Sequence, residues 1–200
     1  IGLFNENFPP IYDGVVLSVI NYAHWLKQKG HDISLITPDA PGKDDSAFPY
    51  PIHRYFSLPL FGRRPYRWGL PVFDRNIHTT VKHLPFDIIH AHTPFSSGNI
   101  ALKAAKERNI PIVATFHSKY RSDIERQAPF KFIVDKMVND IVKFFNQVDE
   151  VWIPQASVEA TLREYGYHGP VHVMPNGSDF SNLDVQPLRT EGRKMLGIKD

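Results

Sequence analysis

The chain has 200 residues, 23 Lys and Arg against 21 Asp and Glu, and no cysteine. A net charge of +2 is too small for a protein that binds nucleic acid through its overall charge, and the lack of cysteine excludes disulfides, a thiol nucleophile and cysteine-ligated zinc. A hydrophobic fraction of 42% and a charged fraction of 22% are typical of a folded domain, and the apolar runs are too short to span a bilayer.

The first 37 residues predict the order strand, loop, helix, strand. A short apolar strand over Ile1–Phe4 is followed by a loop over residues 5–14 and by a helix from Val15, in which apolar residues recur at three- and four-residue steps. Gly30 ends this helix, and a second strand is predicted over Asp32–Thr37. This order is typical of a parallel crossover unit.

The same alternation returns after residue 85. We expect strands over Phe86–His92, Pro111–His117, Glu150–Ile153 and Val171–Met174, and helices over Ser97–Arg108, Phe130–Phe145 and Ser157–Tyr165. The strands are nearly continuous apolar runs, as expected when helices cover both faces of a sheet. The predicted fold class is therefore α/β: a Rossmann-like doubly wound, mostly parallel sheet flanked by helices.

Two stretches interrupt this alternation. Residues 46–73 contain four arginines, eight aromatic residues and five prolines, but no Asp or Glu. This composition fits either a surface loop packed by its own aromatic side chains or a surface that contacts an anionic membrane or an acidic acceptor, and the clustering of arginine with aromatic residues favours contact. Residues 178–200 are polar and predict a linker, whose end at Thr190–Leu196 begins a helix.

Several residues with chemical potential lie where predicted strands end. Gly14 precedes the first helix, where a helix N-terminus favours anions and a residue without a Cβ lets a ligand approach; a plain turn glycine is the alternative. Because neither a G-x-G-x-x-G pattern nor a Walker A motif is present, the loop is not a dinucleotide or P-loop site. Asn176-Gly177 follows the last predicted strand and is typical of a turn.

Three histidines also lie at strand ends. His90 and His92 share one face of a strand, and such a pair can bind a metal in a hydrolase. No carboxylate cluster accompanies them, which favours one histidine at a polar cleft and the other in a structural role. His117 ends the next strand, where an imidazole can hydrogen-bond a sugar hydroxyl, shuttle a proton or cap a loop.

Four blocks of the chain resemble GT-B glycosyltransferases of the group-1 type, family 4. They are Pro9-Pro10 with Asp13-Gly14-Val15 and Lys29–Ile33, then Phe86–Phe95 with Gly98, then Ile110–His117, and finally Met174–Gly177. The resemblance covers nearly the whole chain but only the N-terminal half of such an enzyme. Asp13-Gly14 in place of a Gly-Gly pair resembles a subset that includes enzymes acting on lipids, whereas Arg121 after Tyr120 departs from an acidic residue often found there.

Carried over residue by residue, the resemblance implies a catalytic role for His117 near the transferred sugar. Asp13 and Gly14 would lie beside the donor diphosphate, and Asn176 and Gly177 at the hinge. The residues implied on the acceptor side are His92, Thr93, Ser118, Lys119, Tyr120, Arg63 and Arg64.

The resemblance implies the N-terminal domain of a retaining transferase that moves a hexose from a nucleotide-diphosphate sugar to a hydroxyl of a lipid or a glycan. It implies no metal or other cofactor. We expect residues 1–177 to form the acceptor-binding domain and residues 178–200 to lead into a donor-binding domain, without which the chain is inactive. The expected location is cytoplasmic, either free or peripheral at the inner face of a membrane through residues 46–73. A non-catalytic nucleotide- or sugar-binding module is the alternative.

Overall fold

A single parallel sheet organises the protein. A computed structural model describes residues 1–117, 119–126, 128, 130–177 and 184–198. Seven strands are ordered β3-β2-β1-β6-β7-β8-β9, and each neighbouring pair is parallel. Their bounds are β1 Gly2–Phe4, β2 Ser34–Pro38, β3 Ile52–Tyr55, β6 Ile89–Ala91, β7 Ile112–Thr115, β8 Glu150–Ile153 and β9 His172–Val173. The α/β fold class predicted from the sequence is confirmed.

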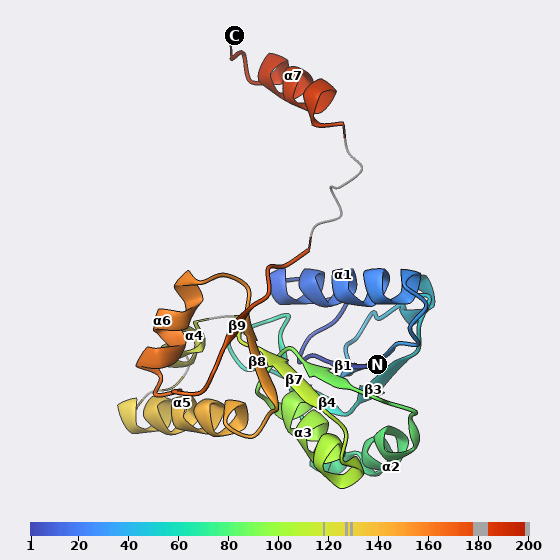
Figure 1. The fold of residues 1–200 in the computed structure, drawn as a ribbon, viewed down its shortest axis with the longest axis vertical. Helices are drawn as coiled ribbons and strands as arrows, with labels where there is room; N and C mark the ends of the chain where they lie inside the picture. The colour runs from blue at the N-terminus through green and yellow to red at the C-terminus, as the bar shows by residue number, and fades with distance from the viewer. Residues whose placement is uncertain (118, 127, 129, 178–183, 199–200) are drawn as a thin grey trace.

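Helices cover both faces of this sheet (Figure 1). Helix α1 lies on one side, and α2, α3 and α5 lie on the other. The helices are α1 Gly14–Gln28, α2 Arg75–His83, α3 Ser96–Arg108, α4 Tyr120–Glu125, α5 Lys131–Phe145, α6 Ser157–Glu164 and α7 Val185–Met195, with short 3-10 turns at η1 Asp45–Ala47 and η2 Pro71–Phe73. The pattern analysis did not predict α2 or α4.

Alternate residues of a strand pack in two separate hydrophobic cores. Leu3 and Leu35 pack with the buried face of α1, whereas the adjacent Phe4 and Ile36 belong to the larger core, which includes buried residues of α3 and α5. Successive side chains of a strand point to opposite faces, so each apolar pair serves both cores. This explains why β1 and β2 carry consecutive apolar residues, as the sequence pattern indicated.

Residues 46–73 contain regular secondary structure that neither interpretation of their composition predicted. The segment supplies β3, which extends the parallel sheet beside β2, and an antiparallel hairpin of β4 Ser57–Pro59 and β5 Arg67–Gly69. Its aromatic residues divide into two groups: Tyr50 and Tyr55 are buried, whereas Phe61 is fully exposed at 100%. The stretch therefore contains strands that were not predicted, while aromatic pairs within it, Phe48–Tyr50 and Phe56–Phe73, agree with packing by its own aromatic side chains.

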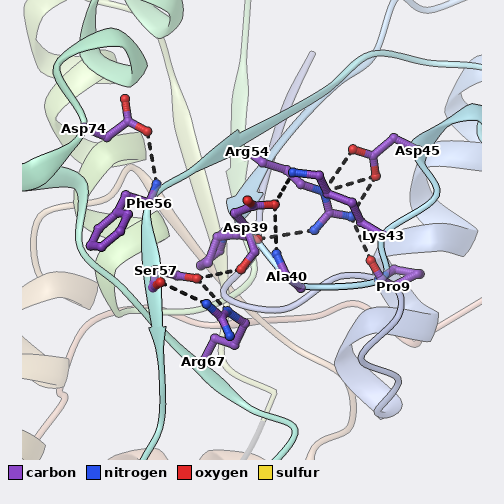
Figure 2. A network of polar contacts seen from close by, with 11 residues as sticks. Pro9, Asp39, Ala40, Lys43, Asp45, Arg54, Phe56, Ser57, Arg67 and Asp74 are labelled. Atoms are coloured by element: carbon purple, nitrogen blue, oxygen red, sulfur yellow. Dashed lines mark hydrogen bonds and ion pairs between the residues drawn. The ribbon is translucent and has the colours of Figure 1, made fainter.

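One arginine of this stretch has a structural role (Figure 2). The side chain of Arg54 is only 5% exposed and pairs with Asp45 at 2.7 Å. Its guanidinium also donates to the carbonyl oxygens of Pro9 at 2.7 Å and Pro38 at 3.3 Å. Arg54 thus joins the β1–α1 loop to β2 and β3, and it does not contribute to a basic surface.

Polar contacts also attach the hairpin to the sheet (Figure 2). The Ser57 hydroxyl donates to the carbonyl oxygen of Asp39 at 2.5 Å. Arg67 donates through Nε to the Ser57 hydroxyl at 2.7 Å, and the Phe56 N–H donates to the Asp74 carboxylate at 3.0 Å. The first bond joins the hairpin to the residue after β2, the second joins its two strands, and the third joins it to the N-cap of α2.

The C-terminal segment contains a helix that starts earlier than expected. Helix α7 is capped by the Asp184 carboxylate, which accepts from Gln186 N at 3.2 Å, and none of its residues is buried. Residues 178–183 lie outside the described residues. The domain boundary at residue 177 therefore stays a prediction. Within the described ranges, no helix is both long and apolar enough to cross a membrane.

Candidate functional site

A large cleft opens at the carboxyl ends of the strands. In a doubly wound sheet, ligands bind where the strand order reverses, which here is between β1 and β6. The cleft has a volume of about 860 Å³. The lining comes from the β1–α1 loop, the hairpin, the segments after β6, β7 and β9, and helices α4 and α5. The described lining residues are Asn5, Glu6, Asn7, Asp13, Gly14, Val15, Leu60, Arg63, Tyr66, Arg67, Trp68, Thr93, Phe95, His117, Tyr120, Asp123, Ile124, Ala128, Ile133, Met137 and Asn176.

The N-terminus of α1 forms one polar corner of this cleft. The Asp13 carboxylate caps the helix and accepts from Val16 N at 2.8 Å. The N–H groups of the first helical turn have no partner within the helix, and Gly14 and Val15 are among the residues that line the cleft. A Cβ built on Gly14 would meet nothing within 4 Å. The structure thus leaves open space for a ligand against this helix end.

His117 forms a second polar group of the cleft. Its strand ends in Thr115-x-His117, and the neighbouring strand ends in His90-x-His92, with both pairs on the α1 face of the sheet. Parallel pairing brings His90 Nε2 to Thr115 Oγ1 at 2.7 Å and His92 Nδ1 to His117 Nε2 at 3.0 Å. The two histidines predicted to share a face indeed do so, with ring centroids 3.9 Å apart.

All three imidazoles are neutral near pH 7. Burial lowers the pKa of His117 to about 4 and, together with the nearby His117, lowers the pKa of His90 to about 3. Burial and the two neighbouring imidazoles also hold the pKa of His92 well below its usual range. A neutral imidazole has one donor and one acceptor nitrogen, so His117 can exchange a hydrogen bond with a ligand without carrying charge.

Glu6 is a site residue that the sequence analysis missed. Its carboxylate lies at the N-terminus of α3 and accepts from Ser96 Oγ at 2.6 Å, Ser97 N at 3.0 Å and Gly69 N at 3.3 Å. Burial raises the pKa of Glu6, and the three donors oppose that rise. Glu6 links β1, α3 and the hairpin below the cleft. No motif marks it, because its partners lie 63 to 91 residues away.

The cleft is also lined by apolar and aromatic side chains, called the apolar wall below. The hairpin contributes Leu60, Tyr66 and Trp68, and the helices beyond His117 contribute Ile124, Ile133 and Met137.

Arg63 is a charged residue that the hairpin contributes to the lining. Its guanidinium lies 5.0 Å from the centre of the Tyr66 ring and 3.5 Å from the Asp123 carboxylate. This ion pair connects the hairpin to α4. The lining therefore combines polar groups at the N-terminus of α1 and at His117, called the polar floor, with the apolar wall.

The predicted site residues are only partly brought together. Those that line the cleft are Asp13, Gly14, Arg63, Thr93, His117, Tyr120 and Asn176. His92 is 0% exposed and reaches the cleft only through His117. Arg64, Lys119 and Gly177 are exposed outside the described lining, and Ser118 lies outside the described residues. Gly177 is tied to α1, since its carbonyl oxygen accepts from Asn21 Nδ2 at 3.4 Å.

The described part of the chain offers no group of three or more His, Asp or Glu side chains arranged to hold a metal ion. His90 and His92 instead pair with Thr115 and His117. The hydrolase alternative considered for this pair thus finds no ligand set among the described residues.

Comparison with known proteins identifies the family. The model of Glycosyltransferase Family 4 matches residues 12–182. The chain belongs to glycosyltransferase family 4. It is 29% identical over 206 residues to the alpha-monoglucosyldiacylglycerol synthase of Streptococcus pneumoniae, covering 100% of this chain and 46% of that protein. For the Acholeplasma laidlawii protein of the same name the identity is 34% over 219 residues, covering 100% of this chain and 52% of the relative.

More distant matches agree with this placement. A phosphatidyl-myo-inositol mannosyltransferase of Mycolicibacterium smegmatis is 26% identical over 113 residues, which is 52% of this chain and 27% of that protein. The solved sucrose-phosphate synthase of Thermosynechococcus elongatus superposes with a TM-score of 0.69 at 17% identity, covering 99% of this chain and 52% of that chain. The chain thus has the fold of one half of that structure and spans about half the length of the two glucosyldiacylglycerol synthases.

Proposed function

We propose that this chain is the acceptor-binding half of a retaining glycosyltransferase, which moves a hexose from a nucleotide-diphosphate sugar to a hydroxyl of a membrane lipid. The observation that carries the proposal is the cleft, because its polar floor and apolar wall suit an acceptor with a hydroxyl at one end and hydrocarbon at the other. Two relatives are named as synthases of a glucosyldiacylglycerol, which supports a lipid in preference to a glycan.

In this proposal the polar floor holds the donor. The diphosphate lies at the N-terminus of α1, where the free N–H groups of Gly14 and Val15 and the helix dipole favour an anion. His117 hydrogen-bonds a hydroxyl of the transferred sugar from the end of β7. The reaction needs no metal ion, and the second half of the enzyme supplies the contacts to the nucleotide. Closure of the two halves orders the reactants and excludes water.

The apolar wall holds the acceptor. Leu60, Trp68 and Met137 provide hydrocarbon contacts for acyl chains near the headgroup, and Thr93 and Tyr120 lie nearer to His117, where the reacting hydroxyl is placed. Arg63 lines the same cleft and can donate hydrogen bonds to oxygen atoms of the lipid headgroup.

The hairpin is the proposed membrane contact. Leu58 and Trp68 are directly paired across its two strands and are both exposed, as is Phe61 at the loop. Exposed Arg64 lies near the same loop. Aromatic and basic side chains together favour the interface of an anionic membrane. We therefore propose a cytoplasmic protein bound peripherally to the inner face of a membrane.

The test uses the full-length enzyme and measures nucleoside diphosphate release from a panel of nucleotide sugars, with vesicles that contain diacylglycerol and with vesicles that lack it. We expect release that requires one sugar and diacylglycerol vesicles, that survives EDTA, and that His117→Ala strongly reduces. Gly14→Ala should also reduce it without unfolding the protein, because the added methyl meets only the ligand space. Absence of release from every donor would contradict the transferase proposal and favour a binding module.

The membrane contact is tested separately by vesicle sedimentation. Phe61→Ser and Arg64→Ser should weaken binding to anionic vesicles, whereas His24→Ser on the exposed part of α1 should not. Equal binding of all three variants would contradict the role of the hairpin.

A further inference from the structure

His92 is completely buried and is hydrogen-bonded to His117, which lines the cleft. His92 Nδ1 lies 3.0 Å from His117 Nε2, and the two rings are nearly parallel at 20° with centroids 5.3 Å apart. The centroid separation exceeds the nitrogen separation by about the width of one imidazole ring, so the two nitrogens point at each other along the line that joins the rings. This geometry is that of an in-plane N–H···N hydrogen bond and not of face-to-face stacking.

Only one proton can occupy this bond. Both imidazoles are neutral near pH 7 because burial disfavours their charged forms, and a neutral imidazole carries a single N–H. In one arrangement, His117 donates from Nε2, and the single proton of His92 is then on His92 Nε2. In the other, His92 donates from Nδ1, and His92 Nε2 is then unprotonated. The environment of His92 Nε2 therefore decides between the two arrangements.

That environment offers no acceptor. His92 Nε2 is buried and has no hydrogen-bond partner among the described residues. The rings that surround His92 are those of Tyr22, with centroids 5.5 Å apart, and His90, with centroids 3.9 Å apart. A buried N–H without an acceptor is rarer and more costly than a buried lone pair without a donor. His92 is therefore protonated on Nδ1 and unprotonated on Nε2.

We propose that His92 is a positioning residue, which donates Nδ1–H to His117 Nε2 and so holds His117 in the tautomer protonated on Nδ1. His117 Nδ1 makes no hydrogen bond with the described residues, so its proton is available to a ligand in the cleft. His117 then presents a donor to a ligand oxygen and has no free lone pair with which to accept a proton. A donor, and not a general base, faces the substrate; this last step depends on the function proposed above, whereas the tautomer does not.

The test reads the tautomer directly. Long-range proton–nitrogen NMR spectra of the full-length protein, labelled with 15N-histidine, distinguish a protonated ring nitrogen from a bare one, and the spectrum of His117→Gln assigns the His117 signals. Two substitutions of His92 form a matched pair. His92→Asn places an amide N–H near the position of Nδ1, whereas His92→Leu supplies no donor. His90→Gln is the control, since His90 pairs with Thr115 and not with His117.

We expect His117 to be protonated on Nδ1 in the wild-type protein, in His92→Asn and in His90→Gln. In His92→Leu it should shift toward the Nε2-protonated form that an unconstrained neutral histidine favours. A wild-type His117 protonated on Nε2 would overturn the proposal, and this result does not depend on any variant folding. An unchanged tautomer in folded His92→Leu would overturn it as well.

Kinetics separate this proposal from the proposed function. With the full-length enzyme, His92→Leu should have a kcat roughly tenfold below that of His92→Asn, the effect of about one hydrogen bond. Equal kcat values, despite a shifted tautomer, would overturn the donor role of His117. If the wild-type protein uses no nucleotide sugar while His117 is protonated on Nδ1, the proposed function fails and the assignment of His92 stands.

Discussion

Glu6 provides the sharpest test of how the cleft is built. In Glu6→Ala, the N–H groups of Ser97 and Gly69 lose the carboxylate that now accepts from them at 3.0 and 3.3 Å. Each buried N–H left without an acceptor costs about 1–3 kcal/mol, which sums to about 2–6 kcal/mol. The Ser96 hydroxyl adds little, because it remains 2.7 Å from the Tyr55 hydroxyl.

The expected loss at neutral pH lies in the lower part of that range. The pKa of Glu6 is raised by burial, which means that the charged carboxylate is itself destabilised in the folded protein and that alanine relieves this cost. We therefore expect the free energy of unfolding to fall by about 2–4 kcal/mol.

Urea denaturation followed by tryptophan fluorescence measures this change. Glu107→Ala is the control, since the Glu107 side chain is 51% exposed and lies 3.8 Å from Lys103; it should change stability by less than about 0.5 kcal/mol. A loss below about 1 kcal/mol in Glu6→Ala would show that the carboxylate does not hold α3 and the hairpin together.

Three further predictions follow from single contacts. Because the folded-state pKa of Glu6 is raised above 4.5, the stability that wild type has at low pH is lost as pH rises through that folded pKa. Wild type should therefore lose stability relative to Glu6→Gln as pH rises above about 4.5, and a difference in melting temperature that does not change with pH would contradict this. In Gly98→Ala the new Cβ would lie 2.2 Å from the Thr93 carbonyl oxygen. We expect the free energy of unfolding, measured by urea denaturation, to fall by about 3 kcal/mol or more. In the control Gly14→Ala it should change by less than about 1 kcal/mol. Arg54→Ala should cost about 2–3 kcal/mol, because it removes the donor to two backbone carbonyls and to Asp45, whereas exposed Lys43→Ala should leave the melting temperature nearly unchanged.

Local sequence was sufficient where an element depends on its own pattern. Helix α1 has the predicted periodicity, a cap at Asp13 and a glycine stop with φ of 87° at Gly30. Inner strand β2 has apolar residues on both faces, because Leu35 packs in the core beside α1 and Ile36 packs in the larger core. The same reasoning placed His117 and Gly14 at strand and helix ends, where a doubly wound sheet binds ligands.

The segment from residue 46 to 73 shows where local pattern is insufficient. Strand β3 lies at the sheet edge and contains His53 and Arg54, so it has no continuous apolar run. It forms because β2 supplies backbone partners and because Asp45 and two carbonyl oxygens satisfy the guanidinium of Arg54. Edge strands obtain their stability from pairing more than from residue preference, and the partner is not visible in the segment itself.

The sequence by itself therefore determined six of the seven strands described in the sheet, most of the helices and the edge at which the cleft opens, since these follow from the spacing of apolar residues and from glycine positions. Only the tertiary structure determined what the cleft contains. Glu6 meets Ser97 across 91 residues, and His92 meets His117 across 25 residues on a neighbouring strand. Parallel strands are joined by long crossovers, so the groups that meet at their ends are distant in the chain, and their burial, charge and proton positions follow from that meeting.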